Sequence, residues 1–277
     1  MTAACAMTGP ATGNIVGNFT GALAGTDPLV SITHVSKLFA NGTLAIQDAN
    51  ITVFPGEFLS ILGPSGCGKS TLLRLIAGLG SPSTGTIDWD QKDACGRGRV
   101  IGFVFQEPTL MPWATAIANV ATPLRLKGAN KNEALERARD MLHRVGLGGF
   151  VSAYPRELSG GMRMRVSIAR ALVTEPQILL MDEPFAALDE ITRNRLNDDL
   201  LALWLRQRFT AVFVTHSVFE SVYLSQRIIV MAARPGRTFA DLKVGSAHPR
   251  DPQFRTSAEY AGLCRTASEA LRGAIAA

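Results

Sequence analysis

The chain has 277 residues, of which 47% are hydrophobic and 18% are charged. This composition excludes a chain that is disordered throughout, because it can bury a full core. It also argues against a membrane-spanning chain, since apolar runs such as 228–233 are far shorter than the ~18–20 residues that cross a bilayer. The net charge of +5 comes from scattered basic residues, so we expect no nucleic-acid partner.

Residues 1–28 contain no Lys or Arg and no sustained apolar stretch, and they are rich in Gly, Ala and Thr. We therefore expect a flexible N-terminal tail and no secretory signal. The cysteines, at positions 5, 67, 95 and 264, form no Cys-x-x-Cys pair. That spacing is typical of a protein from a reducing compartment.

Short apolar segments that predict strands begin just after this tail and lie at 30–35, 50–54, 57–62, 86–89 and 100–105. Between about 115 and 173 the hydrophobic period is that of helices. One of these helices has a capping box at Asn130 and Glu133 and ends at Gly146.

Strands and helices alternate again after this block. Strands are predicted at 177–181, 210–215 and 227–231, and helices at about 190–208 and from Ser217. This alternation, with near-continuous apolar strands, predicts an α/β fold with a mostly parallel sheet covered on both faces. The last ~25 residues predict one short helix, with Leu263, Ala267 and Leu271 on one face.

A glycine-rich phosphate loop lies between a predicted strand and a predicted helix, and reads Gly63-Pro64-Ser65-Gly66-Cys67-Gly68-Lys69-Ser70-Thr71. Its glycines let backbone N–H groups curve around a phosphate, and the following helix points its positive end at the same charge. Lys69 is expected to reach the β- and γ-phosphates of a nucleotide, and Ser70 to give Mg²⁺ a hydroxyl ligand.

An acidic pair ends another predicted strand, in the run Ile178-Leu179-Leu180-Met181-Asp182-Glu183. A parallel strand delivers such residues to the sheet edge where the phosphate loop also lies. Asp182 then suits Mg²⁺, usually through water, and Glu183 suits a general base that activates a water molecule. Taken alone, the pattern is equally consistent with a strand that ends in a solvated acidic turn.

A second candidate anion cradle is Leu158-Ser159-Gly160-Gly161-Met162, which precedes a predicted helix. It offers a hydroxyl, two glycine amides and a helix N-terminus. Taken alone, it favours an N-capped helix behind a glycine loop. Its place upstream of the acidic pair, in a chain that has one phosphate loop, favours the cradle.

These motifs resemble those of the ATP-binding subunits of ABC transporters, over about residues 29–245. The order that carries the resemblance is the phosphate loop, Gln106, the Leu-Ser-Gly-Gly run, the acidic pair, Asp189 and His216. The resemblance implies a P-loop NTPase core with an N-terminal antiparallel β portion and a helical insertion at about 107–173. A short helical tail would follow at 246–277. Implied ligands are ATP and Mg²⁺.

The resemblance also implies roles for single residues. Gln106 would contact Mg²⁺ or the attacking water, and its loop, 106–113, would touch a membrane partner. His216 would hold the γ-phosphate and Glu183 in place, and Asp189 would lie between the two active sites of a dimer. Phe39 falls where the family places an aromatic ring under the adenine, although a simple core residue remains the alternative.

Two positions depart from the family pattern, because Met162 replaces the usual Gln and Ser217 the usual Asp. Neither change removes a phosphate ligand or the base, so we expect activity to survive both. Together with the loop 106–113, they resemble the branch of importers for nitrate, sulfonates, taurine and pyrimidine precursors. ATP hydrolysis would then power the import of such a small anion or organic nutrient.

The implied partners are a second copy of the chain, integral-membrane permease subunits and, indirectly, an external substrate-binding protein. In the dimer, Ser159 and the amides of Gly160 and Gly161 of one copy would complete the site on the phosphate loop of the other. The subunit would be peripheral, at the cytoplasmic face of the inner membrane. The alternative is a soluble ABC-type ATPase that acts on a non-transport macromolecular partner.

Cys67 lies inside the phosphate loop and has two interpretations. It is either a small residue that fills a position where Ser is also common, or a thiol whose alkylation blocks ATP binding.

Overall fold

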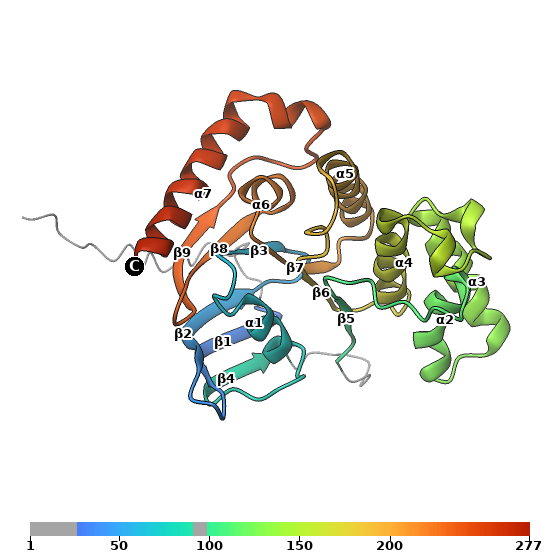
Figure 1. Cartoon of the computed structure of the whole chain (residues 1–277), viewed down its shortest axis with the longest axis horizontal. Coiled ribbons are helices and arrows are strands. Elements are labelled where there is room, and N and C mark those ends of the chain that lie inside the picture. Colours follow the sequence, from blue (N-terminus) through green and yellow to red (C-terminus); the bar gives the residue numbers. More distant parts are fainter. Residues whose placement is uncertain (1–26, 91–98) are drawn as a thin grey trace, which may run out of the picture.

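The computed structural model describes residues 27–90 and 99–277, so the tail predicted at 1–28 falls almost wholly outside the described residues. In the described part of the chain, six strands form one large sheet, in the order β5-β6-β7-β3-β8-β9 (Figure 1). Neighbouring strands are parallel except for β8 and β9, which confirms the mostly parallel α/β fold. The strand bounds are β3 Phe58–Leu62, β5 Ile101–Val104, β6 Ile178–Asp182, β7 Thr210–Thr215, β8 Arg227–Ala232 and β9 Arg237–Lys243.

The large sheet is apolar on both faces because its strands are covered on both sides. In β3, Phe58 and Leu62 pack into the core under the C-terminal helices, whereas Leu59 and Ile61 pack into the core beneath α1 (Lys69–Ile76). Strands that are buried on both faces have near-continuous apolar sequences, which is why their positions could be predicted. Strand β9 was not predicted because it is a half-exposed edge that alternates poorly and carries Arg237, Asp241 and Lys243.

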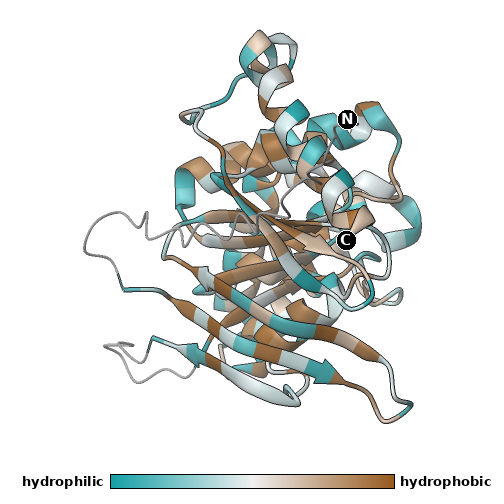
Figure 2. Cartoon of the chain, turned by 90° about the vertical axis from the view of Figure 1, so that its left-hand side faces the viewer, coloured by the Kyte–Doolittle hydropathy of each residue, from teal (hydrophilic) through white to brown (hydrophobic). Residues whose placement is uncertain are grey.

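The small sheet is antiparallel and consists of β2 (Leu44–Val53), β1 (Val30–Leu38) and β4 (Thr84–Trp89), in that order. It confirms the expected N-terminal antiparallel portion. Its strands show alternating hydrophobic and hydrophilic colours, because one face packs on the core and the other is solvated (Figure 2). Strand β2 starts earlier than the sequence predicted. Gln47 and Asp48 are both exposed, and these two consecutive polar residues interrupt the apolar alternation that would have marked the strand.

Between β5 and β6 the chain forms a helical lobe, seen at the right of Figure 1. It contains α2 (Ala116–Leu126), α3 (Lys131–Arg144) and α4 (Gly160–Leu172), with the short turns Gly148–Phe150 and Pro155–Glu157. As predicted, α3 starts after Asn130, whose side chain accepts a hydrogen bond from Asn132 N at 2.8 Å. The chain leaves the helix at Gly146, where φ is 76°.

The helices α5 (Glu190–Gln207), α6 (Val218–Leu224) and α7 (Ala258–Ala276) pack on one face of the large sheet (Figure 1). The short turn Pro252–Thr256 precedes α7. The predicted short C-terminal helix is 19 residues long and joins the core. Its buried stripe includes small residues such as Cys264, Ala267 and Ala274, which give a weak hydrophobic pattern. Among the described residues, no helix is both long and apolar enough to cross a membrane.

Arg250 ties the segment before α7 to the end of α6. The side chain is buried, and Nη1 donates to the carbonyl oxygens of Val222 at 2.7 Å, Tyr223 at 2.9 Å and Ser225 at 2.9 Å. These carbonyls lie at a helix end, where no helical N–H can bond them. Burial lowers the pKa of Arg250 to about 10, which leaves the guanidinium charged at neutral pH.

We predict that Arg250→Met lowers the free energy of unfolding by about 2–4 kcal/mol, because it leaves buried carbonyls without a donor. The matched control is Arg265→Met, at an exposed position of α7, which should change it by less than about 0.5 kcal/mol. Urea unfolding measures both. Equal stability of the two variants would contradict the anchoring role of Arg250.

Candidate functional site

Strands β3, β6 and β7 end at the same edge of the large sheet, and each is followed by a residue that the sequence singled out. The phosphate loop begins at Gly63 after β3, Glu183 follows β6, and His216 follows β7. The ends of the three strands are level because Leu62, the last residue of β3, pairs with Thr215, the last residue of β7. Strand β7 lies between β3 and β6. The fold therefore brings these predicted residues together, as parallel strands must.

The phosphate loop depends on glycine. Gly66 and Gly68 have φ angles of 78° and 92°, in the left-handed region that favours glycine. A Cβ at Gly68 would also come within 2.6 Å of Ala45 O. Helix α1 begins directly after Gly68, so its free N–H groups face the loop. This is the geometry that binds a phosphate group.

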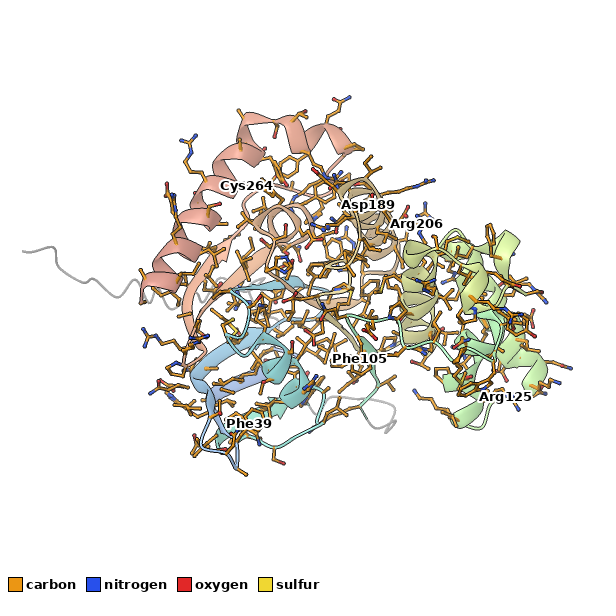
Figure 3. The ribbon with its side chains drawn as sticks, in the orientation of Figure 1. Phe39, Phe105, Arg125, Asp189, Arg206 and Cys264 are labelled. Atoms are coloured by element: carbon orange, nitrogen blue, oxygen red, sulfur yellow. The ribbon has the colours of Figure 1, made fainter. Side chains whose placement is uncertain are left out.

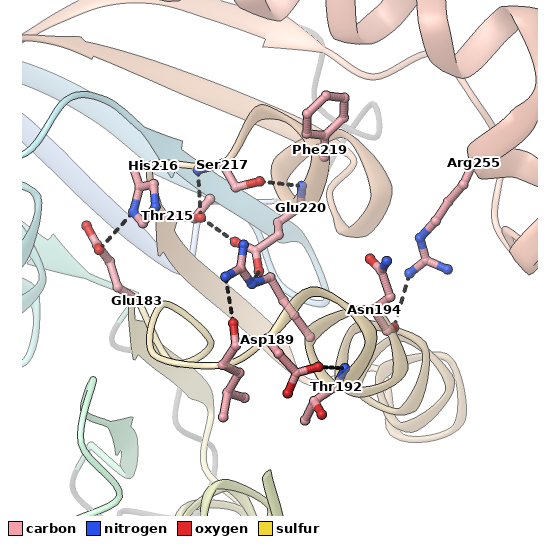
Figure 4. Close-up of polar contacts among 12 residues, drawn as sticks. Glu183, Asp189, Thr192, Asn194, Thr215, His216, Ser217, Phe219, Glu220 and Arg255 are labelled. Atoms are coloured by element: carbon pink, nitrogen blue, oxygen red, sulfur yellow. Dashed lines mark hydrogen bonds and ion pairs between the residues drawn. The ribbon is translucent and has the colours of Figure 1, made fainter. Parts of the chain in front are cut away.

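Lys69 connects the loop to the acidic residue at the end of β6. Its side chain is buried, and Nζ donates to the carbonyl oxygens of Gly63 and Pro64 at 2.9 Å each. The same nitrogen lies 3.2 Å from Glu183 Oε1. The other carboxylate oxygen, Oε2, lies 3.0 Å from His216 Nδ1 (Figure 4). Lys69, Glu183 and His216 thus form one connected polar chain at the sheet edge.

Asp182 and Ser70 form a second polar pair next to this chain. Ser70 Oγ donates to Asp182 Oδ1 at 2.7 Å. Burial raises the pKa of Asp182, while this hydrogen bond acts to lower it. A hydroxyl and a carboxylate oxygen are ligands that Mg²⁺ prefers. The described residues contain no group of three or more His, Cys, Asp and Glu that could hold a metal ion, so a metal here would need further oxygen ligands from elsewhere.

The phosphate loop opens into a cavity of about 780 Å³. Its lining includes predicted residues from the loop, together with Gln106 and Glu183. It also includes two segments that the sequence analysis missed, 43–45 at the start of β2 and 234–236 between β8 and β9. Gly236 packs so closely on the phosphate loop that a Cβ there would lie 2.0 Å from Cys67 O, a contact that no local sequence pattern signals. The full lining is Thr43, Leu44, Ala45, Ser65, Gly66, Gly68, Lys69, Ser70, Thr71, Gln106, Glu183, Arg234, Pro235 and Gly236.

Several predicted binding residues do not line this cavity in the described part of the chain. Phe39 is exposed beyond the end of β1, well separated from Asp189 at the start of α5 (Figure 3). Ser159 caps α4, where its Oγ accepts from Met162 N at 3.3 Å, and Gly160 and Gly161 form the first turn. The single chain therefore separates the Leu-Ser-Gly-Gly run from the phosphate loop.

Asp189 is the N-cap of α5. Its Oδ1 accepts a hydrogen bond from Thr192 N at 3.0 Å. Hydrogen bonds from Thr192 lower the pKa of Asp189, which keeps this exposed carboxyl ionised. The local capping role accounts for an acidic residue at this position.

The segment after Gln106 is held by side chains from the helical lobe. Arg170 donates to the carbonyl oxygens of Pro108 and Thr109, each at 2.9 Å. Trp113 lies in the same segment with 77% of its surface exposed. Sequence reasoning missed Arg170, because it lies far along the chain from the residues it holds. The lobe thus presents a fixed loop with an exposed indole.

Cys67 is fully buried in the phosphate loop. Its Sγ would lie 2.7 Å from a Cβ placed on Gly63, so the thiol fills the space beneath the loop. Burial raises the pKa of the thiol, which lowers the fraction of reactive thiolate at neutral pH. These features support the small packing residue over the reactive thiol.

We predict that iodoacetamide labels Cys67 at least about tenfold more slowly in the folded protein than in the urea-unfolded chain, because the thiol is buried and protonated. Peptide mapping by mass spectrometry separates Cys67 from the other cysteines. The variant Cys67→Ser should keep nucleotide binding, since the loop binds through its backbone. Labelling at the unfolded rate would show that the thiol is accessible.

Comparisons with known proteins show which family the chain resembles. Residues 46–186 match the family described as ABC transporter. An uncharacterised ABC transporter ATP-binding protein of Methanocaldococcus jannaschii is 50% identical over 230 residues, or 83% of this chain and 85% of that protein. An aliphatic sulfonates import ATP-binding protein of Bacillus licheniformis is 45% identical over 233 residues, or 82% of this chain and 90% of that protein.

A solved structure is similar in fold as well. It is the dimeric, post-hydrolysis state of an ATP-binding cassette bound to ADP and Pi, with a TM-score of 0.68 and 35% identity over 79% of this chain and 100% of that chain. The relatives share the family across most of their length, and the solved cassette was captured after hydrolysis. The chain therefore belongs to the ABC transporter family, as an ATP-binding subunit that hydrolyses ATP.

Proposed function

We propose that the chain powers a membrane importer for a small anionic nutrient, with aliphatic sulfonates as the favoured class. Nitrate, taurine and pyrimidine precursors are the other substrates of the branch that the sequence resembles. Support for sulfonates comes from relatives named aliphatic sulfonates import ATP-binding proteins in several Bacillus species, at 40–45% identity. The catalytic part of the proposal rests on one observation, that polar contacts join Lys69 to Glu183 and Glu183 to His216.

In the proposed reaction, the phosphate loop binds the ATP phosphates and Lys69 transfers its contacts from Glu183 to them. Glu183 then accepts a proton from a water molecule, and the water oxygen forms a bond to the γ-phosphorus. The bond from the γ-phosphorus to the bridging oxygen breaks, which releases ADP and phosphate. His216 keeps the carboxylate oriented during this step, because its Nδ1 lies against Glu183 Oε2.

Mg²⁺ fits the pair formed by Ser70 and Asp182, whose oxygens are already adjacent. When bound, the ion would neutralise charge that develops on the phosphate oxygens. Gln106 borders the same cavity and would complete the surroundings of the ion or the attacking water.

A second copy of the chain would complete each ATP site. Ser159 at the N-terminus of α4 is exposed, Gly160 is half-buried and Gly161 is buried, and none of the three lines the cavity of their own chain. This placement supports a partner role for them, and a solved relative is dimeric. The γ-phosphate would draw both cradles together, and hydrolysis would let the dimer reopen. Asp189 would lie between the two ATP sites of the dimer. Phe39 is exposed and does not line the cavity, so it would need to move toward the cavity to contact the adenine.

The loop 106–113 would transmit this closure to permease subunits. Its support is the exposed Trp113 on a segment that Arg170 holds firmly. The subunit would then lie against the cytoplasmic face of the membrane, and an external substrate-binding protein would deliver the nutrient to the permease. Selectivity would be a property of those partners, because in this proposal the chain does not contact the nutrient.

We predict that Glu183→Gln still binds ATP but loses hydrolysis by about 10²- to 10⁴-fold, because it lacks the general base.

Purified from native membranes with ATP and Mg²⁺, tagged Glu183→Gln should retain a multi-span permease. Mass spectrometry identifies the partner, and its binding protein can then be tested with aliphatic sulfonates. The matched control, Glu175→Gln, changes an exposed glutamate away from the cavity and should keep wild-type hydrolysis.

The docking part is tested separately by Trp113→Ala in the Glu183→Gln background. This variant should retain less permease, whereas Leu79→Ala, which removes a comparably exposed apolar side chain on another surface, should not. Recovery of only ribosomal, DNA-bound or assembly proteins would favour the soluble alternative and contradict the importer.

A further inference from the structure

Both neighbours of His216 are hydrogen-bonded to Glu220, Thr215 to its buried side chain and Ser217 to its backbone N–H. Glu220 Oε2 accepts from Thr215 Oγ1 at 2.5 Å, and Glu220 N donates to Ser217 Oγ at 3.3 Å. Thr215 Oγ1 in turn accepts from Ser217 N at 3.0 Å (Figure 4). The backbone that carries His216 is therefore held from both sides, and Ser217 acts as the N-cap of α6.

A second group, Arg193, holds the segment that contains Asp189. It lies in the first turns of α5, and its Nη2 donates to Leu188 O at 2.7 Å, directly before Asp189. Asp189 itself is fixed by its cap on Thr192. The position of this segment is thus tied to the position of the Arg193 guanidinium.

These two groups meet, but their contact is incomplete. Arg193 Nε lies 4.0 Å from Glu220 Oε1, and both atoms are buried without a hydrogen-bond partner among the described residues. A charge-assisted hydrogen bond between such groups has a length of roughly 2.7–2.9 Å. A buried donor or acceptor atom without a partner is costly, so a movement of about 1 Å that joins Nε to Oε1 would be favourable.

The protonation of Glu220 also depends on Arg193. Burial raises the pKa of the carboxyl, while the Thr215 hydrogen bond and the nearby charge of Arg193 lower it. A closer Arg193 would therefore stabilise the ionised carboxylate further, and the bond to Thr215 would strengthen with it.

We propose that Arg193 and Glu220 are positioning residues that couple the Asp189 segment to His216. When the Asp189 segment moves, Arg193 closes on Glu220, and Glu220 adjusts Thr215 and hence the adjacent His216. The inference rests on the proposed function, in which His216 orients Glu183 and Asp189 faces a second copy. It gives the dimer a physical route from its interface to the catalytic carboxylate.

The test compares the ATPase kinetics of Arg193→Gln, Glu220→Gln and the double variant. Each single change should lower kcat by about 10- to 100-fold with the KM for ATP unchanged within about twofold, because His216 is misplaced while the phosphate loop is intact. The double variant should be no slower than the slower single variant, since either change already breaks the connection.

The matched control is Arg195→Gln, an exposed arginine two residues along the same helix, which should keep the wild-type kcat. Urea unfolding and binding of a fluorescent ATP analogue confirm that each variant is folded. If Glu220→Gln does not fold, Arg193→Gln still decides, because Arg193 lies nearer the surface. A folded Arg193→Gln with wild-type kcat, or single effects that multiply in the double variant, would overturn the proposal.

His216→Ala separates this proposal from the proposed function. It should lower kcat at least as much as the Arg193 and Glu220 variants. If His216→Ala is impaired while the Arg193 and Glu220 variants are not, the coupling fails and the proposed function stands. If His216→Ala keeps the wild-type kcat, the orienting role of His216 in the proposed reaction fails, and the coupling fails with it.

Discussion

The pairing of the buried Lys69 ammonium is the interaction on which the rest of the site depends. A buried cation must be paired, and its partners are the carbonyl oxygens of Gly63 and Pro64 and the carboxylate of Glu183. This pairing holds the phosphate loop against the end of β6 and orients Glu183 toward His216. An incoming phosphate is a stronger anionic partner for Lys69. In the proposed reaction, the binding of ATP and the release of Glu183 from Lys69 are therefore linked through one side chain.

The fold makes this pairing possible because β3, β6 and β7 run in parallel and end level. Each strand is buried on both faces, which fixes its register and leaves only its carboxyl end for chemistry. The helices after β6 and β7 begin near the same edge, so their first residues can be tied together, as Arg193 and Glu220 nearly are. The site is thus a set of strand ends and helix starts, and in the proposed dimer the helical lobe of the second copy would add Ser159.

The sequence predicted those parts of the site that lie in continuous motifs. The phosphate loop, the acidic end of β6 and the capped start of α4 each carry a local signal, and the fold class followed from apolar strands alternating with helices. Strand β9 and the full length of α7 were not predicted, because a half-exposed edge and a stripe of small residues give weak periodicity. The lining by 234–236 and the pairing of Arg193 with Glu220 depend on contacts between distant segments, which no local pattern encodes.

The central claim is that one ATP site is built from two chains, and mixing two inactive variants tests it most directly. Lys69→Ala removes the phosphate-loop cation, and Ser159→Arg blocks the partner cradle. In a mixed dimer both defects fall in the same composite site, which leaves the other site intact. The account predicts that each variant alone fails to hydrolyse ATP and that the mixture regains hydrolysis. A mixture that stays inactive although mixed dimers form would contradict it.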